Sequence, residues 1–420
     1  MKKILVLGAS ALALGFGVSA AHAEDPLKLT LSGGAQEAFG YVGNPTGKNN
    51  GNPGKVYQFG DGSIDFDAKT KLDNGITVEF NAALNISGGN DGGAARGSQG
   101  TSVGGNVITS TGYSAKGLPS SENDWIAFSG SFGKFEIGDD FNAAFQAHND
   151  APYFGMIGGY NWGRNSGYIG GPSLTGASGK GGAGLKIANQ IGNIQTVMFD
   201  DYEASKVVYT TPSFGGFGVT ASFTPQANSA DACCGAMSQT GGTSYSGGVD
   251  EAVAVFYKGD MGDAKVNLDV GYVLEQAGGA RGIDFGASIN FKGFTLGGSF
   301  VNRGREGTDA DELMKIADTF GNTWDIGIGY ETGPWGLTIG YMRAAAAAGN
   351  GVANFSMTSG GTALSGDQTY EMVPFTGKYT LGPGVTLNTE IGWDKWSTPD
   401  GKATDQISGV YALLGTTVSF

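Results

Sequence analysis

The chain contains few residues of the types that form disulfides, bind transition metals or transfer protons. Its 420 residues include two cysteines, Cys233 and Cys234, and two histidines, His22 and His148. Structural zinc sites use four Cys or His ligands, so no metal site of that kind is predicted. Adjacent cysteines bond only through a strained ring. The pair can form that bridge, link protomers or stay free, and we interpret it as a loop feature without a chemical role.

The scarcity of histidine also weighs against catalysis. His148 is followed by Asn149 and Asp150, whereas an acid–base or nucleophilic centre needs a histidine with a serine or acidic partner in a fixed geometry. His148 fits that requirement poorly. We therefore predict no enzymatic activity and no cofactor, and we interpret His148 as a neutral or pH-responsive loop residue.

Long apolar runs are absent beyond residue 23, which excludes helical membrane spans of roughly 20 residues. The first 23 residues differ from the rest. Lys2 and Lys3 precede an apolar run over 4–18, and Ala21-His22-Ala23 is a small-residue cleavage motif. This pattern predicts a secretory signal peptide over 1–23, removed to leave 24–420. An N-terminal membrane anchor is the alternative, but the apolar run is short for a span.

Basic residues are outnumbered by acidic ones. The chain has 25 Lys and Arg against 39 Asp and Glu, a formal charge of −14, and removal of residues 1–23 leaves 23 against 39, or −16. Nucleic-acid binding requires a basic surface that follows the phosphates. The charge balance therefore excludes nucleic acid as a partner and favours attraction of cations.

Glycine and aromatic residues are abundant instead. There are 77 glycines, against an average share of about 7%, and 24 Phe, 16 Tyr and 6 Trp. Glycine disfavours an ordinary helical enzyme, while the aromatic content excludes a disordered or collagen-like chain. Glycines at 271, 286, 327 and 329 fall on the polar side of apparent strands, where small residues would leave room for water.

Strict alternation of apolar with polar or small residues runs through the chain from residue 24. In 264–275 one face carries Val266, Leu268, Val270, Tyr272 and Leu274, while the residues between them are polar or glycine. The same alternation recurs in 324–331 and 385–394. A period of two predicts strands with one face in an apolar medium.

The connections between these strands alternate in length. Short turn signals occur at 72–75, 131–133, 213–216, 259–263, 291–294, 332–334 and 381–384. Longer stretches lie at 44–55, 88–122, 139–202, 226–250, 277–281, 304–322, 344–368 and 397–405, so the alanines 344–348 are read as loop. With a first strand from Leu27 and a last strand to Phe420, seven turns predict sixteen strands, with all long loops at one rim.

These patterns predict an all-β fold, a 16-stranded antiparallel transmembrane β-barrel, because closure leaves no unpaired edge in lipid. Aromatics at strand ends support it as two interfacial girdles. The expected members are Phe132, Phe135, Phe214, Phe217, Phe291, Phe294 and Trp335 beside the turns, and Tyr41, Tyr272, Tyr341, Trp393 and Tyr411 toward the loops. A soluble β-sandwich or β-helix is the alternative, but it leaves the loop alternation unexplained.

The segment 124–138, followed at once by the longest loop, and the final strand 411–420 ending in Phe420 resemble the Gram-negative general diffusion porins, particularly the sixteen-stranded alphaproteobacterial type. The resemblance implies short periplasmic turns, long extracellular loops, and a third long loop that folds inward and narrows the barrel. It also implies an outer-membrane homotrimer whose terminal strand is read by the barrel-assembly machinery.

Matching the third loop to that family places the constriction at about 139–202, with Asp139, Asp140, Asp150 and Arg164 among its charged residues. Calcium could bridge the three aspartates. Strand parity predicts seven basic groups on the inner wall: Lys69, Lys71, Lys134, Lys206, Lys265, Arg303 and Arg305. It predicts eleven acidic groups there: Asp65, Asp67, Glu79, Glu136, Asp269, Glu275, Asp284, Asp325, Glu331, Glu390 and Asp394.

The predicted function is passive diffusion of small hydrophilic solutes and ions through a water-filled outer-membrane channel. Opposed charges across a narrow polar pore select by size and charge, and the acidic excess predicts weak cation selectivity. Two alternatives remain open: a channel that prefers sugars or organic ions, and a surface receptor or adhesin on a barrel platform.

Overall fold

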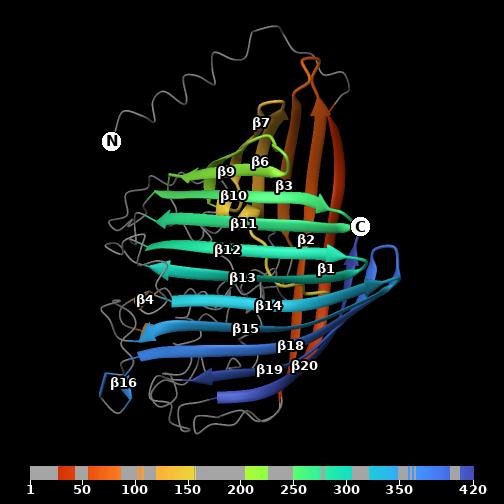
Figure 1. Cartoon of the computed structure of the whole chain (residues 1–420). Coiled ribbons are helices and arrows are strands. Elements are labelled where there is room, and N and C mark those ends of the chain that lie inside the picture. Colours follow the sequence, from red (N-terminus) through yellow and green to blue (C-terminus); the bar gives the residue numbers. More distant parts are fainter. Residues whose placement is uncertain are drawn as a thin grey trace.

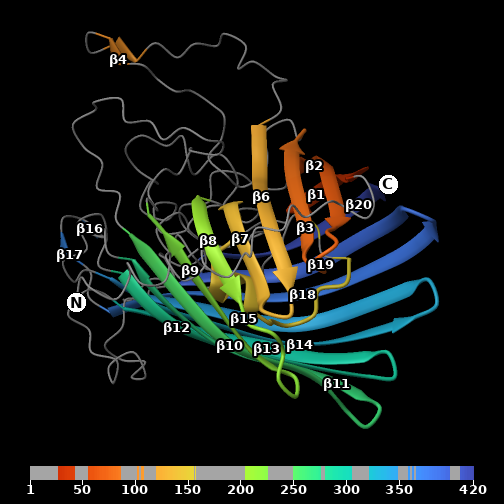
Figure 2. The ribbon, with the colours of Figure 1, turned by 90° about the horizontal axis from the view of Figure 1, so that it is seen from above.

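Sixteen antiparallel strands close into one barrel in the computed structural model (Figures 1 and 2). The structure describes residues 27–42, 55–86, 102–103, 106–107, 120–155, 157, 204–225, 249–275, 280–304, 321–348, 358–359, 362–363, 366–397 and 407–420. Each barrel strand pairs with its neighbours in chain order, and the first strand closes the ring by pairing with the last, from Gly34↔Ser419 to Val42↔Tyr411. Within the described ranges, no helix has the length and apolar character needed to cross a membrane.

The barrel strands are β1 (Lys28–Val42), β2 (Lys55–Lys71), β3 (Thr77–Asn85), β6 (Ser120–Gly130), β7 (Gly133–Asp139), β8 (Ser205–Thr210), β9 (Phe217–Thr224), β10 (Asp250–Met261), β11 (Ala264–Glu275), β12 (Ala280–Phe291), β13 (Phe294–Gly304), β14 (Gly321–Thr332), β15 (Trp335–Ala348), β18 (Gly366–Gly382), β19 (Val385–Ser397) and β20 (Ile407–Ser419). Outside the barrel, β4 (Ser102–Val103) pairs with β5 (Asn106–Val107), and β16 (Thr358–Ser359) pairs with β17 (Thr362–Ala363). One short helix is described, α2 (Ala143–Ala147).

The predicted strand number and all seven short turns are confirmed. Each turn joins two consecutive barrel strands, and glycines with positive φ occur in several of them, including Gly75 at 84° and Gly293 at 85°. The Asn74 side chain also accepts a hydrogen bond from the Ile76 N–H at 3.1 Å, as expected for a polar turn residue. The prediction that 344–348 form a loop is wrong, because β15 continues through Ala348.

The two faces of the sheet are inverted relative to a soluble protein. On β11, Leu268 and Val270 are each 43% exposed, whereas Asp269 between them is 3% exposed. The pattern repeats on β14, where Ile326 is exposed beside the buried Asp325. Exposed apolar residues on the outer face and buried polar residues on the inner face are the arrangement that a lipid environment requires.

Aromatic rings gather at the strand ends, as predicted. Near the short turns, Phe294 packs on Tyr330 and Trp335 packs on Tyr379, with ring centroids 4.3 Å and 4.4 Å apart. Tyr411 departs from the prediction of a girdle position. It is 1% exposed, and its hydroxyl donates to the Glu390 carboxylate at 2.6 Å, so it belongs to the inner face.

Candidate functional site in the barrel interior

The chain leaves β7 and crosses the inner face of the barrel as residues 140–155 and Ile157, called here the inward segment. It begins with α2, whose N-cap Asn142 accepts a hydrogen bond from the Phe145 N–H at 3.0 Å. The Phe141 and Phe145 rings stack at 4.1 Å. Small side chains on α2 let the helix lie close to the wall, and they form a dry cluster of Ala143 and Ala144 with Val208, Ala252, Val273 and Val301.

A row of inner-face side chains, called here the anchor residues, holds the inward segment. They come from seven strands: Ser222, Asp269, Asp284, Asp325, Thr338, Thr376 and Glu390. Seven strands between β9 and β19 thus use the same face of the sheet to contact one short segment. In a closed barrel only the interior permits this, so the segment lies inside.

Most of these contacts are hydrogen bonds from backbone N–H groups of the segment. Asp269 accepts from the Asn149 N–H at 2.8 Å, and Asp325 accepts from the Ala151 N–H at 2.7 Å. Glu390 accepts from the Ile157 N–H at 3.1 Å. Bonds from N–H groups to carboxylates are among the stronger hydrogen bonds in proteins. They also satisfy donors that would otherwise be buried without partners.

Glycines on the inner face make room for this segment. A side chain at Gly286, Gly297, Gly327 or Gly329 would bring its Cβ within 3.1 Å of atoms of Asn149, Asp150, Ala151 or Phe154, respectively. The prediction that glycines of this face leave room for water is therefore wrong for 286, 327 and 329, where the space is taken by protein. The glycine at 271 likewise lies against α2, with Ala144 3.0 Å from the position of an added Cβ.

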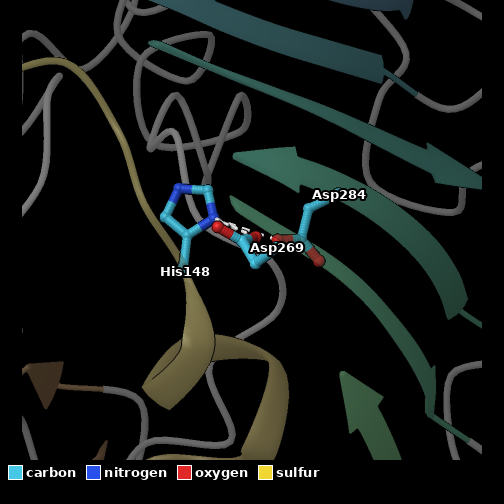
Figure 3. A group of neighbouring side chains, drawn as sticks. All are labelled: His148, Asp269 and Asp284. Atoms are coloured by element: carbon cyan, nitrogen blue, oxygen red, sulfur yellow. Dashed lines mark hydrogen bonds and ion pairs between the residues drawn. The ribbon is translucent and has the colours of Figure 1, made fainter. Parts of the chain in front are cut away.

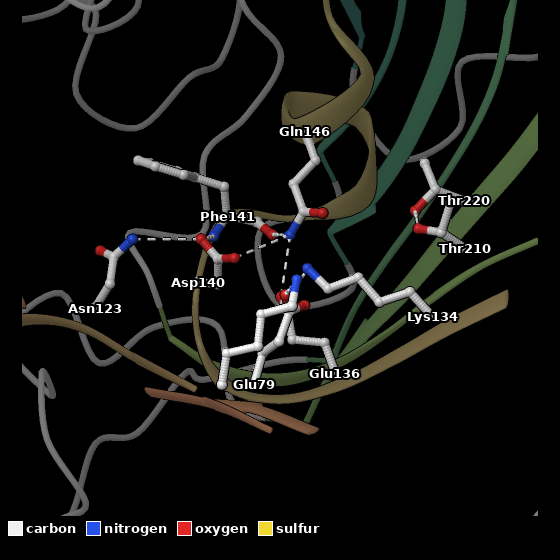
Figure 4. Close-up of polar contacts among 10 residues, drawn as sticks. Glu79, Asn123, Lys134, Glu136, Asp140, Phe141, Gln146, Thr210 and Thr220 are labelled. Atoms are coloured by element: carbon white, nitrogen blue, oxygen red, sulfur yellow. Dashed lines mark hydrogen bonds and ion pairs between the residues drawn. The ribbon is translucent and has the colours of Figure 1, made fainter. Parts of the chain in front are cut away.

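Three of the predicted site residues, Lys134, Glu136 and Asp140, meet where the inward segment begins (Figure 4). Asp140 accepts from the Phe141 N–H at 2.7 Å, and Gln146 Nε2 lies 3.2 Å from Asp140 Oδ2 and 3.3 Å from Glu136 Oε1. Lys134 Nζ is 2.5 Å from Glu136 Oε2. Burial, assisted by the neighbouring Glu136, raises the pKa of Asp140 to about 7.

Asp139 lies just outside this group. It is the last residue of β7, 3% exposed, and it accepts a hydrogen bond from the Ser205 hydroxyl. Asp150 lies on the inward segment, with its carbonyl near Gly297 of β13. Lys69, on β2, forms an exposed ion pair with Glu79 of β3 at 2.5 Å. Asp139, Asp140 and Asp150 form no metal-binding group among the described residues, which removes the support for a calcium bridge.

Several of the other predicted residues fall outside the described part of the chain. Arg164, Arg305 and the cysteines 233 and 234 are not in the described ranges, nor are residues 1–23. Arg303 lies on β13 opposite Gly282 of β12 and Gly321 of β14, but the structure describes only its backbone. The roles predicted for these residues stay predictions.

Burial divides the predicted inner-wall carboxylates into two groups. Glu136, Asp269, Asp284, Asp325 and Glu390 are at most 3% exposed, so they are enclosed by protein and do not face open solvent. Lys206 is also buried, at 2% exposed, and donates to the Ala204 carbonyl at 2.5 Å. The predicted set of seven basic and eleven acidic groups therefore contains more charged groups than a solute in the interior would meet.

His148 lies where the segment passes β11 and β12 (Figure 3). Its Nδ1 atom is 2.9 Å from Asp284 Oδ2 and 3.7 Å from Asp269 Oδ2. Burial opposes the charged imidazolium, but the two neighbouring aspartates outweigh it and raise the pKa of His148 to about 10. The raised pKa favours the charged form of His148 and does not support its interpretation as a neutral residue.

The anchor role is the feature that sequence reasoning missed. Strand parity places Asp269, Asp284, Asp325 and Glu390 on the inner face, but it gives no sign of what covers them. The partners lie far away in the sequence, up to 233 residues for Ile157 and Glu390. One signal for it is present in the sequence: β11, β12 and β14 each carry both an acid and a glycine on the inner face. The glycines leave space for another stretch of chain, and the acids can accept hydrogen bonds from its backbone N–H groups.

Comparisons with solved structures support the fold. The outer-membrane channel DcaP of Acinetobacter baumannii has a TM-score of 0.55 at 13% identity, covering 94% of this chain and 97% of that chain. An anion-selective porin from Comamonas acidovorans has a TM-score of 0.53 at 16% identity, covering 94% and 100%. Salmonella typhi OmpF in complex with daunomycin has a TM-score of 0.54 at 10% identity, covering 95% and 100%.

Comparison with curated protein sequences gives no match. The family model for Gram-negative porins, however, matches residues 8–398, which is most of the chain. That match agrees with the sixteen-stranded closed barrel, its inverted faces and the segment that crosses its interior. The chain belongs to the Gram-negative porin family and is an outer-membrane channel protein.

Proposed function

We propose that the protein forms a water-filled channel for passive diffusion of small hydrophilic solutes and ions, with no catalytic step, after cleavage of residues 1–23. The observation that carries this proposal is that the barrel has an apolar outer face and a polar inner face, and that the inward segment fills part of its interior. The apolar outer face suits lipid, and the inner face is polar. The inward segment occupies part of the interior along β9 to β19, which limits the size of a passing solute.

The constriction is formed by the start of the inward segment and the wall next to it. Lys134 forms an ion pair with Glu136 on the same strand, β7. The Gln146 amide donates hydrogen bonds to Glu136 and to Asp140. The Lys69–Glu79 pair adds exposed charge on β2 and β3. Opposed charges in a narrow polar passage orient dipolar solutes and disfavour apolar ones. Arg164, Arg303 and Arg305 remain proposed contributors.

We propose weak cation selectivity. Asp65 and Asp67 on β2 are half-buried, and they accept hydrogen bonds only from neutral side chains in the described contacts, so their charges act on the interior. The exposed basic groups Lys69 and Lys134 are each paired with a glutamate. The formal charge of −16 that remains after removal of residues 1–23 acts in the same direction. Selectivity is weak because the buried anchor acids contribute little.

The proposal includes a homotrimer in outer-membrane lipid. The solved OmpT structure from Vibrio cholerae is described as a trimer form, and it resembles this chain with a TM-score of 0.52 at 11% identity. The C-terminal strand would be the signal for the barrel-assembly machinery. Phe420 is 65% exposed, and its backbone exchanges two hydrogen bonds with Gly33 at 3.0 Å and 3.1 Å.

Single-channel recording in a planar bilayer tests the proposal. A general diffusion channel gives ohmic current steps that sugars and organic ions do not saturate or block, and a KCl gradient gives a reversal potential of the cation-selective sign. Concentration-dependent block by one solute would instead indicate a substrate-preferring channel. Negligible conductance from correctly folded protein would indicate a receptor or adhesin. An anion-selective reversal potential would reject the charge assignment alone.

A further inference from the structure

Three metal-ligand side chains converge inside the barrel from three separate elements. His148 follows α2 on the inward segment, Asp269 lies on β11 and Asp284 lies on β12. One ligand atom from each lies within 4.8 Å of the other two, and this is the single such group among the residues that the structure describes. Figure 3 shows the imidazole Nδ1 edge turned toward both carboxylates.

The group is deeply buried and incompletely paired. The side chains of His148, Asp269 and Asp284 are 4%, 0% and 0% exposed. Asp269 Oδ1 accepts two hydrogen bonds from Asn149. Asp269 Oδ2 contacts the imidazole only as an ion pair at 3.7 Å, and neither this oxygen nor Asp284 Oδ1 accepts a hydrogen bond within the described part of the chain. Buried carboxylate oxygens without partners cost free energy, so each calls for an explanation.

The composition of the group suits a divalent cation. Such a cation, held by a neutral imidazole and two carboxylates, makes the group neutral. Its position between Nδ1 and the two Oδ2 atoms would also give the buried Asp269 Oδ2, which lies 3.7 Å from Nδ1, a closer partner.

We propose that His148, Asp269 and Asp284 form a binding site for a divalent transition metal ion of the zinc class, which fastens the inward segment to β11 and β12. The ligands would be Nδ1 of His148 and one carboxylate oxygen from each aspartate. An imidazole with two carboxylates suits Zn²⁺, whereas Ca²⁺ and Mg²⁺ prefer oxygen alone. Asn149 already fixes Asp269 through two hydrogen bonds, as the partners of metal ligands commonly do.

This site goes beyond passive diffusion, and its test does not depend on current. The full chain, with Cys233→Ser and Cys234→Ser to remove competing thiolates, is refolded in detergent with a chelator, which is then removed by desalting. The metal-free protein is titrated with Zn²⁺ by calorimetry. Bound metal is counted by elemental analysis after desalting. The expected result is one Zn²⁺ per chain. Binding should release protons, because the metal replaces the proton on His148.

Variants separate the site from general loss of the anchored segment. His148→Gln and Asp284→Asn should each weaken Zn²⁺ binding tenfold or more. Glu390→Gln is the matched control, since Glu390 is an equally buried anchor of the same segment but lies outside the group. It should leave the affinity within twofold. Heat-modifiable migration on gels confirms that each variant is a folded barrel.

Co²⁺ provides a second readout on the chain with His148 intact. The His148 nitrogen and two aspartate oxygens, with one water as the fourth ligand, should give strong ligand-field bands that His148→Gln abolishes. The absence of stoichiometric Zn²⁺ binding by this chain would overturn the proposal, as would equal affinity in His148→Gln. Equal loss of affinity in Glu390→Gln would also overturn it, because binding would then depend on the segment as a whole.

Discussion

The inner wall of the barrel has two regions that use the same residue types differently. Along β9 to β19, carboxylates such as Asp325 and Glu390 are buried and accept hydrogen bonds from the backbone of the inward segment. Along β2 and β3, the contacts of Asp67 and Glu79 within the described ranges are with side chains of the wall. The difference indicates that the role of an inner-face carboxylate depends on whether the inward segment lies over it. A covered carboxylate holds the backbone of the segment, whereas the charge of an exposed one acts on ions in the interior.

The largest contrast is expected between Asp325→Ala and Asp67→Ala. Removing Asp325 leaves the buried Ala151 N–H and the Ser299 hydroxyl without this acceptor, which costs about 1–3 kcal/mol for each buried group that finds no other partner. The segment should loosen, so single-channel recordings should show larger and noisier current steps. Asp67→Ala should leave the step size steady and alter only selectivity. Equal noise in both variants would contradict the division of the wall.

Filling the groove should move the segment without removing an anchor. Valine at Gly286 places side-chain atoms against the Asn149 backbone, and overpacking of this kind costs about 1–3 kcal/mol. We expect a lower unfolding temperature and an altered conductance for Gly286→Val. Gly382→Ala is the control, because an added Cβ at that position meets no atom within 4 Å. A Gly286→Val channel with unchanged conductance would show that the segment does not depend on this contact.

Selectivity should depend on pH through Asp140. Its pKa is raised to about 7 by burial and by the neighbouring Glu136, and the charge of Lys206 opposes that rise. Asp140 is therefore mostly neutral at pH 5 and mostly charged at pH 9. Cation selectivity should rise as pH increases through 7, measured as the reversal potential in a KCl gradient. Asp140→Asn should flatten this change, and a full pH response in that variant would assign it to another group.

The smallest effect is expected for the exposed pair on the uncovered wall. Lys69 is 68% exposed in its ion pair with Glu79, and solvent-exposed pairs contribute less than about 1 kcal/mol. Lys69→Gln should leave the unfolding temperature within measurement error and shift the reversal potential slightly toward cations. A clear loss of stability would show that this wall is also held by its charges.

Most of the fold can be predicted from the sequence because each strand and each turn shows a pattern within its own residues. Alternation on β11 and the turn glycines at 75 and 293 depend on neighbours in the chain, so strand number and turn positions are local properties. The burial of Tyr411 and the covering of Asp325 depend on residues far away in sequence. No local pattern distinguishes an inner-face aspartate that meets water from one that meets the Ala151 backbone.

The same distance explains why the site was predicted only in outline. Lys134, Glu136 and Asp140 lie within one short stretch, so the alternation of β7 and the start of the loop after it are enough to propose them as pore residues, and that role stays a prediction. His148 was read against Asn149 and Asp150, its neighbours in sequence, while its contacts are Asp269 and Asp284 on strands that come more than a hundred residues later. The alanines of β15 were misread because alanine has no marked preference that separates strand from loop there.

The anchoring of the inward segment also sets an order of assembly. The N–H group of Ile157 reaches Glu390, which lies 233 residues later in the chain, and contacts of such separation form late because their loop-closure entropy must be met first. The bond from Ile157 therefore cannot form until β19 has joined the sheet. The far end of the inward segment is fixed only as the wall of the barrel is completed, whereas its start can be held earlier by β9 and β11.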